Sequence, residues 1–400
     1  MVKLYQMKSG KFKSTQGPLL ALFLLVWSFL VHAQEVKERN WSLNGYVKDM
    51  VTVISLSDSI LVDNLIHNRL NFRWYPSDKL TLFVEMRNRV FSGDLVKAIP
   101  NYGEFIDTNN DFLDMSVLWV NNDNLVIHSV FDRAYVQWTS ADWEIRFGRQ
   151  RINWGTNVAW NPNDLFNAYS FFDFDYEERP GSDALRITKY MGFASSLELA
   201  AKFTDDIDKA VAALMYKVNK WNYDFQFIGG IMQGDVALGS GWAGNLGNAS
   251  FKGELTWFSP FNNRPDAGDA FASSFSIDYS FKNSLYLLGS YLFNSEGYIK
   301  MPRGQSILLS SETLSARNLM PFKQSALIQL SFPLHPLINT GAALMAFPGD
   351  NSIFINPTLT FSLAESLDLG LFGQLFYGEK PGGKYGAVTK AAFARVKWSF

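Results

Sequence analysis

The C-terminal segment constrains the fold more than any other part of the sequence, because its residues alternate strictly between two faces. One face of the segment Val388–Phe400 is apolar and ends in two aromatic rings, whereas the other carries two basic side chains. The first face consists of Ala392, Ala394, Val396, Trp398 and Phe400, and the second of Ala391, Phe393, Arg395, Lys397 and Ser399. Such a strand suits lipid on one side and water on the other. It predicts a strand of a transmembrane β-barrel, with an edge strand of a soluble sandwich as the alternative.

The same period of two recurs along the chain and predicts an all-β, antiparallel, up-and-down transmembrane barrel. We expect about 18 strands, with 16 as the alternative, since single-chain bacterial barrels have an even number. The predicted strands are 41–54, 64–76, 79–91, 127–140, 142–152, 182–190, 193–203, 209–219, 222–233, 235–246, 249–258, 270–281, 284–297, 321–333, 337–347, 352–364, 367–378 and 388–400. The division at Gly234-Asp235 is the weakest, because it rests on keeping the long connections on one side.

Short and long connections alternate between these strands. Outer-membrane barrels have short periplasmic turns and longer extracellular loops. We therefore predict long extracellular loops at 92–126, 153–181 and 298–320, and both termini in the periplasm. The 92–126 loop alternates acidic and apolar residues, so we expect it to fold against a basic wall of the barrel.

The first 33 residues have the pattern of a cleaved signal peptide. Met1–Lys13 is basic, Pro18–Val31 is apolar, and Ala33 closes a small-residue cleavage site. The apolar run is shorter than the roughly 20 residues that a spanning helix needs. We predict export to the cell outer membrane, removal of residues 1–33, and a single barrel domain over residues 34–400.

The composition excludes several other classes of protein. The sequence has 36 basic residues, 38 acidic residues and no cysteine. Near-neutral charge argues against nucleic-acid binding, and the lack of cysteine excludes a disulfide scaffold and a thiolate metal site. Only Gln34–Asn40 precedes the first predicted strand, so a plug domain for active uptake is not expected. We expect no cofactor and no resident metal ion.

One stretch departs from plain alternation: Phe147–Gly155 (FGRQRINWG), Trp160–Asn167 (WNPNDLFN) and the acidic Phe171–Asp183. This GRQ…WG…NP-D pattern resembles a largely uncharacterised family of Gram-negative outer-membrane β-barrels, in the form found in its Bacteroidota branch. It is loosely similar to alginate-export-type porins. The resemblance implies the fold and the outer membrane, and it implies no substrate.

The motif lies at the end of a strand that is predicted to run from the periplasmic to the extracellular side, and it leads into a long loop. Asn161–Asp164 predicts a turn, because proline fixes φ and Asn and Asp satisfy local backbone groups. We expect the loop to fold into the mouth and to be held by charge-assisted hydrogen bonds between its acidic residues and nearby arginines. Alternatively, it constricts the pore and selects solutes, or its acidic cluster binds calcium. The candidate residues are Arg149, Gln150, Arg151, Trp154, Trp160, Asn161, Asp164, Asp173, Asp175 and Glu178.

Alternation also assigns a set of arginines to the lumen, because a charge facing lipid would cost about 2–4 kcal/mol. The predicted lining residues are Arg69, Arg73, Arg87, Arg89, Arg133, Arg146, Arg186, Glu85 and Glu144, with Arg395 and Glu198 on the same face. A basic wall concentrates anions, unless Glu85, Glu144 and Glu198 neutralise it. Aromatic residues assigned to the lumen, as space-fillers or as a sugar track, are Phe131, Tyr135, Tyr75 and Tyr46.

We therefore predict a porin-like passive channel for small solutes, with anions favoured. The alternatives are a gated transporter or exporter of hydrophobic or polymeric cargo, and a plugged structural or surface-interaction barrel. Enzymatic activity is not expected: His128 precedes Ser129, but adjacent strand residues face opposite sides and cannot form a nucleophile–base pair. Expected partners are outer-membrane lipid, a small solute, and the barrel-assembly machinery through the strand that ends at Phe400. No nucleic acid is expected, and the oligomeric state is left open.

Overall fold

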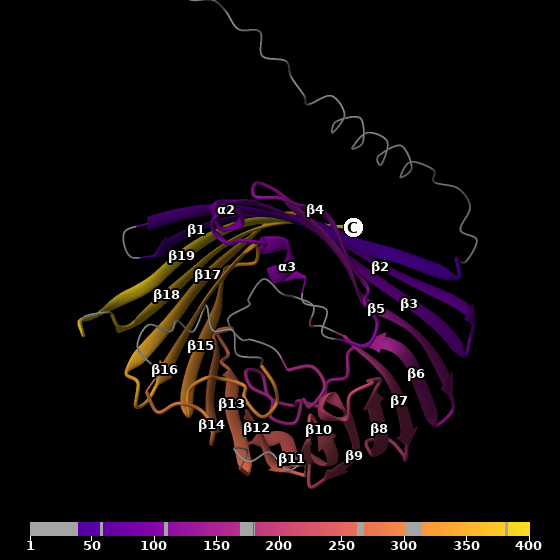
Figure 1. Ribbon diagram of the computed structural model, residues 1–400. Coiled ribbons are helices and arrows are strands. Elements are labelled where there is room, and N and C mark those ends of the chain that lie inside the picture. The colour runs from indigo at the N-terminus through magenta and orange to yellow at the C-terminus, as the bar shows by residue number, and fades with distance from the viewer. Residues whose placement is uncertain are drawn as a thin grey trace, which may run out of the picture. The chain divides into compact units, whose positions relative to one another are not determined.

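Antiparallel strands pair in a closed ring over Trp41–Phe400, because β1 pairs both with β2 and with β19 (Figure 1). The computed structural model describes residues 39–56, 59–107, 111–168, 179, 181–261, 268–300, 314–380 and 383–400. The 18 strands of the ring are β1 (Trp41–Leu56), β2 (Ser59–Ser77), β3 (Leu80–Gly93), β5 (Val126–Ser140), β6 (Trp143–Gln150), β7 (Ser182–Tyr190), β8 (Ser196–Lys202), β9 (Val211–Lys220), β10 (Tyr223–Met232), β11 (Asp235–Leu246), β12 (Ala249–Pro260), β13 (Ala270–Ser280), β14 (Tyr286–Asn294), β15 (Gln324–His335), β16 (Ile338–Phe347), β17 (Ser352–Ala364), β18 (Leu367–Glu379) and β19 (Tyr385–Ser399). Closure leaves no free sheet edge along the wall. The predicted 18-stranded antiparallel barrel is confirmed.

Most strand boundaries lie close to the predicted ones. The uncertain division at Gly234-Asp235 is correct, since β10 ends at Met232 and β11 begins at Asp235. Gln233 and Gly234 both have positive φ, 52° and 84°, which is the backbone of a type I′ hairpin turn. Four predicted starts are wrong by three residues or more: β2 begins at Ser59 rather than at 64, β8 at Ser196 rather than at 193, β15 at Gln324 rather than at 321, and β19 at Tyr385 rather than at 388.

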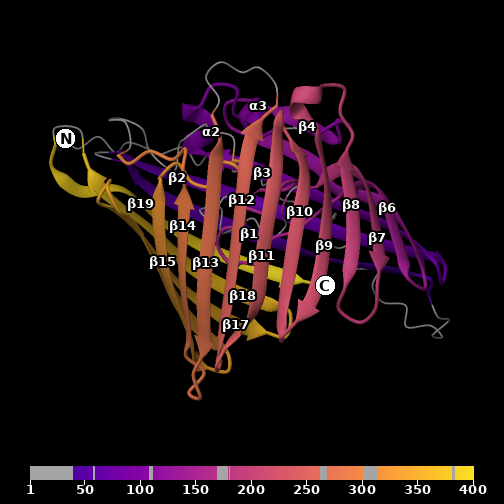
Figure 2. The ribbon, with the colours of Figure 1, turned by 90° about the horizontal axis from the view of Figure 1, so that it is seen from below.

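The connections divide the barrel into a short-turn end and a long-loop end, names that are kept below (Figure 2). Short turns such as 78–79, 221–222 and 365–366 join strands at one end. The connection between β3 and β5 holds two short helices, α2 (Asp94–Ala98) and α3 (Tyr102–Ile106), and that between β8 and β9 holds η1 (Ile207–Lys209). In the described part of the chain, no helix has the length and apolar character to cross a membrane. The placement of both termini in the periplasm stays a prediction.

A nineteenth strand, β4 (Ser116–Asn121), lies outside the ring order and is not predicted from the sequence. β6 pairs with β5 only over Ala134–Ser140, whereas β4 pairs with β5 over Val126–Val130. β4 therefore continues the wall where β6 has ended and covers backbone groups that would otherwise form an exposed edge. It has only six residues, too few for a clear alternating pattern.

Apolar side chains fill part of the interior near the long-loop end. One buried cluster joins Trp154 and Phe166 to inward residues of β7–β13, and a second joins Trp160 and Phe322 to inward residues of β14–β18. The segment 151–168 thus packs inside the ring, as Figure 1 shows, and is called the lumen loop below.

Candidate functional site

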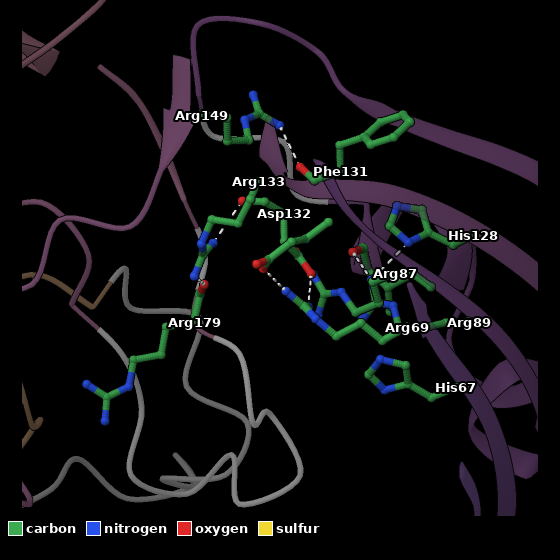
Figure 3. Close-up of polar contacts among 12 residues, drawn as sticks. His67, Arg69, Arg87, Arg89, His128, Phe131, Asp132, Arg133, Arg149 and Arg179 are labelled. Carbon is green, nitrogen blue, oxygen red and sulfur yellow. Dashed lines mark hydrogen bonds and ion pairs between the residues drawn. The ribbon is translucent and has the colours of Figure 1, made fainter. Parts of the chain in front are cut away.

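A β-bulge in β5 brings a carboxylate into the lumen beside two arginines. The register between β3 and β5 shifts at this point, so that Asp132 and Arg133 both face inward, against simple alternation. Asp132 Oδ2 accepts a hydrogen bond from Arg69 Nη1 at 2.6 Å, and its Oδ1 accepts one from Arg87 Nη2 at 2.9 Å (Figure 3). One carboxylate therefore bridges two strands of the wall.

Arg69 is the centre of this network. Its Nη2 lies 2.6 Å from Glu85 Oε2, and its Nε donates to Asn71 Oδ1 at 2.9 Å. Arg69 is 0% exposed and Asp132 is 3% exposed. Charge-assisted hydrogen bonds are strong in such surroundings, and loss of a partner leaves a buried charge uncompensated. Four of the inward arginines of β2, β3 and β5 are called the arginine cluster below: Arg69, Arg87, Arg89 and Arg133.

Two histidines border the arginine cluster (Figure 3). His128 Nδ1 lies 2.9 Å from Arg89 Nη2, and its Nε2 lies 3.0 Å from Asp107 Oδ1. Asp107 belongs to the connection after β3, so this contact ties that connection to the wall. His67 Nε2 lies 3.4 Å from the Tyr46 hydroxyl. Each histidine is thus part of the packed wall.

Two further predicted lining arginines form ion pairs on the lumen side. Arg186 binds Glu198 through Nε and Nη2, at 2.7 and 2.6 Å. Arg146 Nε lies 3.0 Å from Glu144 Oε1. Glu85, Glu144 and Glu198 therefore each contact one arginine, so the neutralisation considered as an alternative takes place at these positions.

Other basic side chains share the same inward face. Arg73 and Arg395 lie over phenylalanine rings, 5.3 and 4.8 Å from the ring centres. Lys48 and Lys397 are cross-strand partners and lie 5.5 and 4.5 Å from the ring centre of Tyr46. We call the inward face of β19, β1–β3 and β5–β7 the basic wall, because basic side chains outnumber carboxylates along it.

On the opposite side, Glu254 of β12 holds the lumen loop. Its Oε1 accepts hydrogen bonds from Thr156 N, from Thr156 Oγ1 at 3.0 Å and from Asn157 N at 2.9 Å. Its Oε2 accepts one from Asn163 N at 2.9 Å. Glu254 is 0% exposed. A single buried carboxylate thus accepts hydrogen bonds from both ends of the segment 156–163 of the lumen loop.

Side-chain amides complete the attachment of the lumen loop. Asn157 Nδ2 donates to Ser274 Oγ at 3.0 Å, and Asn163 Nδ2 donates to the Ser240 carbonyl at 3.0 Å. A Cβ at Gly239 would lie 2.7 Å from the Asn163 side chain, so the glycine makes room for it. Trp154 Nε1 donates to Glu198 Oε1, which places this motif residue between the two walls.

Asp164 is the least satisfied polar group of the lumen loop. It is 1% exposed, and neither carboxylate oxygen has a hydrogen-bond partner in normal geometry. Burial raises the pKa of Asp164 to about 8, against the opposing effect of the Arg151 guanidinium and with a smaller contribution from the Glu254 carboxylate. The protonated form is therefore favoured while the loop is docked.

Arg149, near the end of β6, connects the segment 111–115 to the start of β7. Its Nε and Nη2 bind the two oxygens of Asp183 at 2.9 and 2.7 Å, and Nη2 also donates to the Leu113 carbonyl. Asp111 lies 3.1 Å from Lys202 Nζ and accepts from Asp183 N at 2.9 Å. Among the described residues, the acidic partner of Arg149 is Asp183.

The other motif residues lie at the base and the tip of the lumen loop. Gln150 Nε2 donates to the Ala184 carbonyl at 3.0 Å, and Trp160 packs in the second apolar cluster. Asp164 N donates to the Asn161 carbonyl at 3.1 Å, which forms the predicted turn. Asp173, Asp175 and Glu178, and with them the acidic cluster considered for calcium, lie outside the described residues. Among the described residues, no group of three acidic or histidine side chains is arranged to hold a metal ion.

A second inward segment, 314–323, closes over the apolar side of the interior. Phe322 stacks on Phe347 of β16, with ring centres 4.1 Å apart. Arg317 fixes this segment by ion pairs to Asp235 at 2.7 Å and to Glu296 at 2.6 Å. The hydrogen bonds to Glu296 and Asp235 raise the pKa of Arg317 above its ordinary value, against the opposing effect of burial.

Sequence reasoning misplaces one aromatic residue and misses several polar ones. Phe131 is assigned to the lumen by alternation, but the β5 bulge turns it to the outer face, where it is 38% exposed. Tyr135 does face inward, under the Arg146 guanidinium. Asp132, Glu254 and Lys48 are missed, because a bulge or a partner distant in the sequence gives each its role.

No family model and no curated protein matches the sequence. Solved structures do match. OccAB4 of Acinetobacter baumannii is 9% identical, with 92% of this chain and 100% of that chain covered and a TM-score of 0.56. OccK5 (OpdH) of Pseudomonas aeruginosa is 8% identical, with coverages of 90% and 98% and a TM-score of 0.58. The outer membrane protein OprD from Pseudomonas aeruginosa is 9% identical, with coverages of 90% and 94% and a TM-score of 0.56.

At these identities the likeness shows a shared fold, that of Gram-negative outer-membrane β-barrel porins of the Occ and OprD type. The narrower resemblance to a Bacteroidota family and to alginate-export-type porins stays a prediction.

Proposed function

We propose that the chain is a passive channel of the outer membrane that favours small anionic solutes. The observation that carries this proposal is the basic wall, where the arginine cluster, Lys48 and Lys397 share one inward face. A positively charged wall inside a low-dielectric channel attracts anions and repels cations. The structural similarity to the outer-membrane protein OprD and to Occ channels supports the same class of function.

In this proposal the lumen loop is the constriction. It is attached to the side opposite the arginine cluster through Glu254, and Arg133 Nη2 donates to the Arg179 carbonyl at 2.7 Å on the other side. The connection between β6 and β7 therefore contacts the wall around Glu254 through the lumen loop, and it contacts the arginine cluster through Arg179. A solute would pass between the loop and the basic wall, where the arginines could select it by charge.

A gated route for hydrophobic cargo would need an apolar pocket inside the barrel. Apolar side chains of β14–β18 do face inward, but Phe322, Trp160 and Met320 pack against them. This surface therefore serves to dock two segments of the chain. We keep the plugged barrel as an outcome of the experiment below.

The proposal extends to location and assembly. We propose export by a cleaved signal peptide over residues 1–33, with both termini in the periplasm and outer-membrane lipid around the wall. Phe400 N and O each bond to the backbone of Gly45 at 2.9 Å, so the last residue completes the closing seam. Recognition of this strand by the barrel-assembly machinery is part of the proposal. A non-enzymatic role fits the engagement of His67 and His128 within the wall.

Single-channel recording in a planar bilayer under a salt gradient tests the function. We expect stable conductance steps and a reversal potential that reports preference for the anion. The double variant Arg73→Glu/Arg395→Glu should shift the reversal potential toward the cation, because both side chains lie on the basic wall. Lys209→Glu, an exposed change in η1, serves as a control and should leave the potential unchanged. A cation-selective wild type would overturn the proposed selectivity, and a folded but silent barrel would support the plugged alternative.

A further inference from the structure

The outer face of the first strands carries polar side chains at positions where lipid contact calls for apolar ones. Asn68, Asn88 and Ser129 each lie between two residues whose side chains face the lumen. Since successive side chains of a strand point to opposite sides, all three face outward. The three positions are direct cross-strand partners on β2, β3 and β5, so their side chains form a row.

Hydrogen bonds connect this row. Asn88 Nδ2 donates to Asn68 Oδ1 at 3.1 Å, and Ser129 Oγ donates to Asn88 Oδ1 at 2.6 Å. Trp119 of β4 donates from Nε1 to Ser129 Oγ at 2.9 Å, and 66% of Trp119 is exposed. We call Asn68, Asn88, Ser129 and Trp119 the polar stripe.

The polar stripe is enclosed by apolar residues on both sides along the strands. Leu70 pairs with Met86 toward the short-turn end, and Ile66 pairs with Val90 toward the long-loop end, both on the same outer face. The stripe therefore lies within the apolar band rather than at its rim. Lipid tails offer no hydrogen bonds there, so polar groups in this band normally contact protein.

A carboxylate lies next to the stripe on the same outer face. Asp49 of β1 alternates with the inward Lys48 and Met50, is exposed, and accepts a hydrogen bond from Asn64 Nδ2 at 2.6 Å. A lipid-facing charge is costly. On the outer face of the opposite wall, Leu214, Phe227, Leu238 and Trp257 are exposed. The polar Ser240 on that face has apolar cross-strand partners, Phe227 and Leu255, and so does not belong to a polar row.

We propose that the polar stripe is an interface between copies of this chain in the membrane. A partner must present polar groups at the same depth of the bilayer, and a second copy does so by construction. Carboxamide side chains both donate and accept, so the surface can complement itself, as interfaces in symmetric oligomers do. The proposal requires a membrane-embedded barrel and is independent of which solute passes through it.

The mass of the purified full chain in a mild detergent, measured by light scattering, tests this proposal. We expect the wild type to form an oligomer. The variant Asn68→Leu/Asn88→Leu/Ser129→Ala should have the mass of a single chain, with wild-type channel conductance. Ser240→Leu, on the outer face of β11, is the matched control and should remain oligomeric. A monomeric wild type, or a triple variant that stays oligomeric, overturns the proposal.

Cross-linking covers the case in which the triple variant does not fold. The sequence has no cysteine, so Asn88→Cys and Ser240→Cys each introduce a single thiol. A short bis-maleimide applied to membranes should link Asn88→Cys chains to each other and should leave Ser240→Cys chains unlinked. Equal linking of both variants, or linking of neither, contradicts an interface at the stripe. Linking of Asn88→Cys to a different membrane protein would identify another partner and also overturn the proposal.

Discussion

The two sides of the lumen use buried carboxylates for different purposes. On the basic wall, Asp132 bridges Arg69 and Arg87, so the acid compensates charges that belong to the wall itself. On the opposite side, Glu254 accepts hydrogen bonds from the backbone and side chain of the lumen loop. The first carboxylate sets the local charge, whereas the second sets the position of a segment. We infer that ion preference and pore width are controlled separately, by different walls.

Removal of the Glu254 carboxylate should break this division most strongly. Glu254→Ala leaves Thr156 N, Asn157 N and Asn163 N without an acceptor, and each buried unsatisfied donor costs about 1–3 kcal/mol. We expect the lumen loop to detach at a cost of about 3–5 kcal/mol in docking free energy. Single-channel conductance should then rise severalfold, while the channel still prefers anions over cations.

Glu254→Gln is the matched control, since it keeps an acceptor oxygen in place. It should give a conductance between those of the wild type and of Glu254→Ala. Unchanged conductance in Glu254→Ala would show that the loop is held by other contacts and does not limit the pore.

On the basic wall, Asp132→Asn should have a smaller effect on conductance and a clear effect on selectivity. The amide keeps an acceptor for one arginine but removes the negative charge between Arg69 and Arg87. We expect a loss of about 3 kcal/mol in the free energy of unfolding, because buried arginines lose compensation. The reversal potential should move further toward the anion, with nearly unchanged conductance.

Asp142→Asn, in an exposed short turn, controls for a general change in charge and should alter neither quantity. If Asp132→Asn raised conductance as Glu254→Ala is expected to, the proposed separation of the two walls would be wrong.

The fold could be predicted from the sequence because alternation is a local signal. Each membrane strand repeats it independently, and turn residues such as Gly234 mark the ends. The failures also have local causes. The bulge at Asp132 adds one residue that no composition change announces, so Phe131 is assigned to the wrong face. β4 is too short to show a period, and it is stabilised by an edge of β5 that becomes free only because β6 is short.

The candidate site could be predicted only in part. Alternation finds the arginines of the wall, since each position depends only on its own strand. It cannot find Glu254, because the loop donors lie more than ninety positions away, as the sequence separations of 91 to 98 show. The same holds for Asp183, which stands at the end of an acidic run but bonds to Arg149 across a long loop. Long-range pairing of this kind follows from the closed barrel, not from any local pattern.

The smallest expected effect concerns Asp164 and its protonation. Its pKa is raised from the ordinary value of 3.8 to about 8 when the lumen loop is docked. The docked state therefore holds its proton more tightly than the released state, and docking weakens as pH rises from the ordinary pKa toward 8, with no further change above it. Brief conductance increases from loop release should become more frequent across that range. In Asp164→Asn the amide cannot ionise, so event frequency should stay at the low-pH level of the wild type, whereas Asp208→Asn in η1 should behave as the wild type. A wild-type event frequency that does not change between about pH 5 and pH 8.5 would show that ionisation of Asp164 does not drive loop release. The hydrogen bonds of Glu254 and Asn163 would then be the determinants of pore width.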